Sequence, residues 1–94
     1  MDKLEQYRKQ VNRVDELILK ALAERAKICV AIGEVKRKRG IAIRDISREN
    51  DVYNSVKEKS VEFGLDPLQV EAVYREIVNM CSAVQEQKGI STES

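Results

Sequence analysis

The chain has 94 residues, 35% of them charged, and a formal net charge of only +1. This balance argues against a dedicated nucleic-acid-binding protein, although residues 36–39 form a short basic run. No apolar run approaches the ~18 residues of a membrane-spanning helix and the N-terminus is amphipathic, so we expect no membrane partner, no signal peptide and a cytoplasmic location. The chain has no histidine, which excludes histidine general bases and the commonest metal ligand.

The composition predicts an all-α protein, because the chain has only four glycines and one proline. We expect a single domain over residues 1–94, with residues 88–94 as a disordered tail. Cys29 and Cys81 are too few and too far apart in sequence to indicate a disulfide or zinc framework. No cofactor motif is present either, so we expect neither a metal nor a cofactor.

Residues 4–39 predict one long N-terminal helix that organises the chain. The stretch lacks proline, and its apolar or small residues recur in steps of three and four, at Leu4, Tyr7, Val11, Val14, Ile18, Ala21, Ile28, Ile32 and Val35. Such a helix is roughly 54 Å long, whereas a compact domain of this size has a radius of gyration of only about 12–13 Å. The remaining residues can hardly cover its apolar stripe, so we expect a homodimer.

Two shorter helices should follow. Gly40 is placed to end the first helix, and Asp45 or Ser47 can cap a second helix that runs to Phe63. Asp66 can cap a third helix, which should lose its periodicity after Gln87.

Cations occupy positions on these helices where apolar side chains are expected. Arg25 lies between Ile18 and Ile32 on one stripe, and Lys36 lies three turns further along the same side. An unpaired buried cation costs several kcal/mol, so acidic neighbours or an anionic ligand must compensate it. Because cations outnumber carboxylates on the inner faces, we favour an anionic small molecule. Arg8 is about 25 Å from Arg25 along the helix, too far to join a pocket on its own helix, but it could join the pocket of an antiparallel partner.

With these residues at these spacings, the chain resembles the all-helical (AroQ-class) chorismate mutases. The resemblance covers nearly the whole length and is carried by the opening YRKQVNRVDELILKALAERAKICVAIGEVK, the connection IAIRDISRE and the third-helix pattern CSAVQ. It implies an intertwined homodimer of three-helix subunits that rearranges chorismate to prephenate on the way to phenylalanine and tyrosine. Arg25 and the partner's Arg8 would bind the two carboxylates of the substrate, and Arg48 would add positive charge nearby.

The resemblance also assigns the remaining site residues. Lys36 and Gln85 would donate to the ether oxygen of the breaking bond, and Asp45 and Glu49 would accept from the ring hydroxyl. The family usually has a small hydroxyl or amide residue where this chain has Cys81, a weak donor, so we expect Cys81 to contribute shape. Ser82 lies about 100° round the helix and cannot simply replace it.

This reaction fits the residues that are present. A [3,3] sigmatropic shift needs no nucleophile, proton transfer, metal or cofactor, so a site without histidine is sufficient. The nearest alternative is an isochorismate-pyruvate lyase, which shares the fold and the cationic pocket; the Asp45, Arg48 and Glu49 pattern favours the mutase. A non-catalytic helical dimerisation or regulatory module is a third possibility, but it has no reason to place Arg25 and Lys36 on an apolar face.

Overall fold

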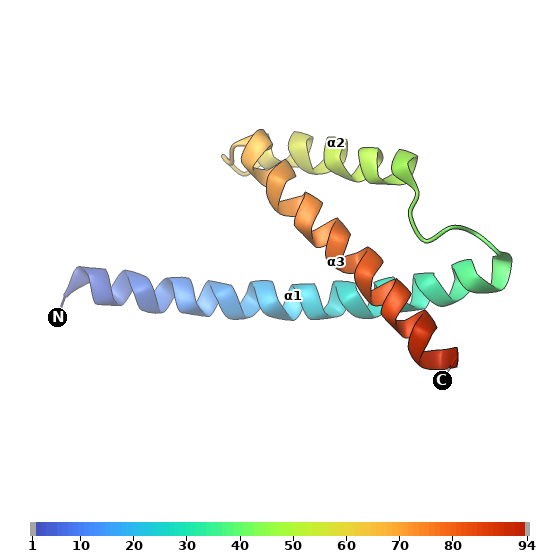
Figure 1. Cartoon of the computed structure of the whole chain (residues 1–94). Coiled ribbons are helices and arrows are strands. Elements are labelled where there is room, and N and C mark those ends of the chain that lie inside the picture. Colours follow the sequence, from blue (N-terminus) through green and yellow to red (C-terminus); the bar gives the residue numbers. More distant parts are fainter. Residues whose placement is uncertain (1, 94) are drawn as a thin grey trace.

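The chain folds into three helices joined by two short connections, as the computed structural model in Figure 1 shows. The structure describes the backbone of residues 2–93 and the side chains of residues 2–86. Helix α1 spans Lys3–Arg39, α2 spans Ile46–Glu62 and α3 spans Pro67–Glu93, and none of these described residues forms a strand. The prediction of an all-α chain with one long N-terminal helix is confirmed, while the dimer stays a prediction.

Local capping sets most of the helix ends. Asp2, Asp45 and Asp66 accept backbone N–H groups from the first turns of α1, α2 and α3 at 3.0, 3.1 and 2.8 Å. Gly40 ends α1 with a φ of 66°, a left-handed conformation that glycine adopts without steric cost. These ends agree with the sequence expectation because caps depend on neighbouring residues only.

The C-terminal end of α3 differs from the expectation. The backbone continues as helix to Glu93, beyond Gln87, where we expected the apolar periodicity of the third helix to end. Extending a helix costs little free energy once the helix is nucleated. The single proline of the chain lies in the first turn of α3, where a proline does not interrupt the helix. The side chains of residues 87–94 lie outside the described residues, and the disorder expected for 88–94 stays a prediction.

The helices are arranged around α3. It packs along α2 and crosses the C-terminal half of α1, whereas α1 and α2 make no contact with each other among the described residues. The N-terminal half of α1, blue in Figure 1, extends away from the other two helices. The radius of gyration is 16.7 Å, against about 12 Å for a compact chain of this length. One subunit alone is therefore elongated rather than globular.

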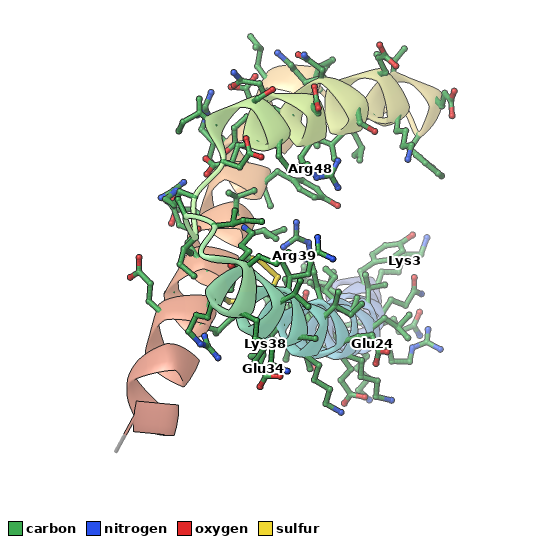
Figure 2. The ribbon with its side chains drawn as sticks, turned by 90° about the vertical axis from the view of Figure 1, so that its right-hand side faces the viewer. Lys3, Glu24, Glu34, Lys38, Arg39 and Arg48 are labelled. Carbon is green, nitrogen blue, oxygen red and sulfur yellow. A yellow bond between two sulfur atoms is a disulfide. The ribbon has the colours of Figure 1, made fainter. Side chains whose placement is uncertain are left out.

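A disulfide between Cys29 and Cys81 joins α1 to α3 where they cross, with a Cα–Cα distance of 5.5 Å (Figure 2). The sequence analysis judged these two cysteines too few and too far apart to indicate a disulfide, and that interpretation is wrong. The two cysteines are 52 residues apart, and only the crossing of the helices brings them together. Closing a loop of this length removes chain entropy from the unfolded state, which stabilises the fold by about 4 kcal/mol.

Few of the described side chains are buried. The buried apolar residues among them are Cys29, Tyr53 and Val78, whereas the stripe on the first half of α1 is exposed to solvent. Its members are each more than half exposed: Leu4, Tyr7, Val11, Val14, Leu17, Ile18 and Leu19. Within the described part of the chain, no helix combines the length and apolar character needed to cross a membrane.

Candidate active site

A cavity of about 330 Å³ lies among the three helices and the connection before α2. This volume falls within the range of pockets that bind small molecules. Seven of the eight side chains expected in the site line it: Arg25, Lys36, Asp45, Arg48, Glu49, Cys81 and Gln85. The cavity wall also contains residues that the sequence analysis did not assign to the site: Ile28, Cys29, Ile32, Ile43, Val52, Val78 and Ser82.

Helix α1 supplies two of the three cations in the cavity wall. Arg25 and Lys36 are both half-buried, and Nη1 of Arg25 lies 3.7 Å from Sγ of Cys29. The ammonium of Lys36 donates to the carbonyl of Ile43, which holds it against the connection between α1 and α2. Among the side chains the structure describes, neither cation makes an ion pair within 4 Å. Both remain available to an anion.

The N-terminal end of α2 supplies the third cation and two carboxylates. Arg48 also has no ion pair among residues 2–86, and Figure 2 shows its side chain extending from α2 into the space facing α1. Oδ1 of Asp45 accepts the backbone N–H of Arg48 as the helix cap. One acceptor site of that oxygen is therefore used by the helix cap, and the remaining acceptor sites of the carboxylate can serve a ligand.

Glu49 is held by an arginine that the sequence analysis missed. Nε and Nη2 of Arg44 donate to the two carboxylate oxygens of Glu49 at 2.9 and 2.7 Å, and Nη1 donates to Oδ1 of Asn79 on α3 at 3.2 Å. These hydrogen bonds from Arg44 lower the pKa of Glu49, because they stabilise its ionised form. The pKa of Arg44 is raised for the same reason. The glutamate is thus fixed in place as a carboxylate at the rim of the cavity.

Replacing Arg44 by alanine is expected to let Glu49 take up a proton at higher pH. A carboxylate with a lowered pKa keeps its charge until the pH falls through the folded-state value. Without Arg44 that value rises towards the ordinary glutamate range, so the titration of the Glu49 carboxyl group, followed by NMR, should move to higher pH. Arg75→Ala is the control, because Arg75 pairs with Glu71 outside the cavity wall and its charge lowers the pKa of Glu49 less than the hydrogen bonds from Arg44 do, so its displacement should be the smaller one. An equal displacement in both variants would contradict this role.

Gln85 is the buried polar residue of the site, with only 3% of its surface exposed. Its Nε2 donates to Sγ of Cys81 at 3.1 Å, while its Oε1 has no partner among the described residues. A Cβ placed on Gly33 of α1 would lie 3.0 Å from Cβ and Cγ of Gln85. The glycine therefore permits the close approach of α1 to α3 that brings the amide to the cavity.

Arg8 is the one expected site residue that does not reach the cavity. It lies on the exposed first half of α1, where Nη1 is 3.9 Å from Oε1 of Glu5. The distance along α1 prevents it from serving the pocket of its own chain. Its assignment to the pocket of a partner stays a prediction.

The cavity presents cations and neutral donors to a ligand. Across the described residues no group of three histidine, cysteine or acidic side chains is arranged to hold a metal ion. The cavity wall combines apolar side chains with three cations that make no ion pair among residues 2–86, a buried amide and a fixed carboxylate, so its interactions with a ligand are mainly electrostatic. This arrangement suits a small anion that also carries a hydroxyl group.

Comparison with known proteins decides the family. The model of the family described as chorismate mutase type II matches residues 7–86. The chain belongs to the chorismate mutase type II family. The resemblance found from the residues is confirmed, and the enzyme class of this family is that of an isomerase. The family match favours the mutase over the two alternatives considered from the sequence.

Relatives of this chorismate mutase family come from bacteria and an archaeon. The chain is 35% identical to the bifunctional chorismate mutase/prephenate dehydratase of Aquifex aeolicus, over 90% of this chain and 24% of that protein. It is 29% identical to the chorismate mutase of Methanocaldococcus jannaschii, over 93% of this chain and 88% of that one. It is also 29% identical to the T-protein of Enterobacter agglomerans, over 90% of this chain and 23% of that protein. The chain thus spans about a quarter of two relatives and most of the third.

Proposed function

We propose that the chain converts chorismate to prephenate in the cavity described above. The observation that supports this most strongly is the lining of the cavity: three cations that make no ion pair among the described side chains surround a buried neutral amide. Chorismate is a dicarboxylate with an ether oxygen and a ring hydroxyl, and the wall offers counterparts to one carboxylate, the ether oxygen and the hydroxyl. The family match supports the same reaction.

The reacting atoms need stabilisation of charge more than they need acid or base groups. As the C–O bond stretches, negative charge develops on the ether oxygen, and Lys36 and Gln85 are the donors we assign to it. Lys36 acts as a point charge, and its ammonium has donors to spare because only one bonds to Ile43. Donors that are already in position gain most strength in the transition state, which raises kcat rather than lowering KM.

The remaining groups position the substrate. Arg25 suits a carboxylate because the guanidinium offers paired donors, and Arg48 adds positive charge from α2. Glu49 accepts from the ring hydroxyl, since each of its oxygens keeps lone pairs beyond those bonded to Arg44. Asp45 can contribute through the acceptor sites that the cap of α2 leaves open. Cys81 shapes the wall. Besides stabilising charge, the site accelerates the reaction by holding the flexible ether in its reactive conformation.

A second copy of the chain completes this proposal. The exposed apolar stripe on the first half of α1 is a surface that a partner helix can cover, and the elongated single subunit leaves it bare. An antiparallel partner would bring its Arg8 to the cavity, where it would bind the second carboxylate. The cytoplasmic location and the lack of nucleic-acid or membrane partners expected from the sequence stay predictions.

The reaction is tested by incubating the purified chain with chorismate and following its absorbance. Loss of chorismate with formation of prephenate supports the proposal. An Arg25→Ala variant should lose most of this activity, whereas Lys27→Ala, on the exposed side of α1, should retain it. Release of pyruvate from isochorismate would instead identify a lyase, and no turnover of either compound would favour a non-catalytic module.

Substituting Gln85 by glutamate is expected to introduce a pH dependence into the reaction. The natural amide cannot titrate, so the rate should vary little around neutral pH. A buried glutamic acid has a raised pKa and can donate to the ether oxygen only while it is protonated. The activity of Gln85→Glu should therefore rise as the pH falls. A flat profile for this variant would show that residue 85 does not touch the reacting oxygen.

A further inference from the structure

We propose that Cys29 and Cys81 form a reversible thiol–disulfide site in the wall of the cavity. Low-molecular-weight thiols reduce this disulfide, and the catalytic activity is lower when it is broken. The bond joins α1 to α3 between the groups that act on the substrate. Cys29 lies one turn from Arg25 and two turns from Lys36, and Cys81 lies one turn from Gln85. The kinetic part of this proposal rests on the proposed function, whereas the chemistry of the disulfide does not.

The cavity is the route by which a small thiol reaches the bond. Both cysteines line it, but Cys29 is only 4% exposed whereas Cys81 is half-buried. Attack on Sγ of Cys81 is therefore favoured. A molecule bound in the cavity blocks that approach, so a ligand of the site should protect the disulfide from reduction.

Arg25 assists the first step of the exchange. The thiolate of the small thiol bonds to Sγ of Cys81 while the bond between the two cysteines breaks and its electron pair leaves with Cys29. The guanidinium of Arg25, 3.7 Å from Sγ of Cys29, favours the thiolate form of that leaving group. Cys29 then takes a proton. A second small thiol attacks the mixed disulfide and releases Cys81 as a thiol, so two thiols are oxidised to one disulfide as the protein bond is reduced.

Breaking the bond changes the contact between α1 and α3. Two sulfurs bonded at about 2.05 Å must separate to a non-bonded contact of roughly 3.5–4 Å. One turn further along both helices, Gly33 and Gln85 are already in close contact. The separation therefore displaces Gln85 relative to Lys36, and it also alters the partner to which Nε2 of Gln85 donates. We expect reduction to lower kcat/KM by about 5- to 100-fold, since a 1 Å displacement can cost up to ~100-fold.

The experiment compares the full chain before and after treatment with dithiothreitol. Alkylation in denaturant, followed by mass measurement, should find no free thiol in the air-oxidised protein and two after reduction. The kcat/KM for chorismate should fall on reduction and return on reoxidation. Saturating prephenate should slow reduction at least tenfold. Free thiols in the oxidised protein, equal activity of the two states, or reduction at the same rate with prephenate would each overturn the proposal.

Two sets of variants separate this effect from other consequences of reducing agents. The double variant Cys29→Ala and Cys81→Ala should have a kcat/KM that dithiothreitol does not change; a change equal to that of the natural chain would contradict the proposal. If the double variant does not fold, Arg25→Gln supplies a test without it. This variant should slow reduction several-fold relative to Lys27→Gln, and equal rates would overturn the role of Arg25. The rate of disulfide reduction is measured without chorismate, so it does not depend on the proposed function. The result therefore distinguishes failure of the redox site from failure of the proposed function.

Discussion

Replacement of Lys36 by alanine should lower kcat/KM by roughly 10³-fold or more, with the loss concentrated in kcat. Removing a single neutral donor from an oxyanion site costs about 10²–10³-fold, and Lys36 carries a full charge as well. Its ammonium lies in the cavity wall with a single hydrogen bond, to Ile43, among the described residues. The interaction with the ether oxygen grows as the bond breaks, so it contributes more to the transition state than to substrate binding.

The control for this variant is Lys38→Ala. Lys38 is exposed, and Figure 2 shows it near Glu34 on the side of α1 that faces away from α2. The Lys38→Ala substitution removes one positive charge from the same end of α1 as Lys36→Ala does, but it does not change the cavity wall. Circular dichroism should give equal helix content for both variants. Near-normal kinetics of Lys36→Ala, or an equal loss in Lys38→Ala, would remove Lys36 from the proposed mechanism.

The helices could be predicted because their signals are local. Asp2, Asp45 and Asp66 cap the helices that they precede, and Gly40 ends α1, which requires knowledge of only a few neighbouring residues. The sequence could also predict that Arg25, Lys36 and Gln85 lie close together. Each interrupts an apolar stripe, and stripes face one another when helices pack.

The residues that were missed depend on how the helices cross or on irregular backbone. The disulfide needs the crossing of α1 over α3, which the periodicity of either helix alone does not give. Arg44 lies in the connection between α1 and α2, where no period assigns a side chain to a face, so its bonds to Glu49 could not be predicted. Ser82 lines the cavity although it lies off the expected inner face of α3. A cavity wall collects side chains from several angles around a helix.

Replacement of Arg8 by alanine should leave the chain nearly inactive if each site is shared between two chains, although Arg8 is far from the cavity of its own chain. Arg13→Ala is the matched control, because Arg13 is also exposed on the first half of α1 but lies at a different angle around the helix. It should keep most of the activity.

Mixing two inactive variants should then restore turnover. When Arg8→Ala and Lys36→Ala chains are unfolded and refolded together in equal amounts, random pairing makes half of the dimers heterodimers. In each heterodimer the Arg8→Ala subunit keeps its own Lys36 and receives an intact Arg8 from the partner, while the other site lacks both residues. One complete site in half of the dimers gives roughly a quarter of the natural activity. If Arg8 acted within its own chain, neither kind of subunit would hold both residues. A mixture that stays inactive although heterodimers are demonstrated by mass spectrometry would therefore refute the shared site.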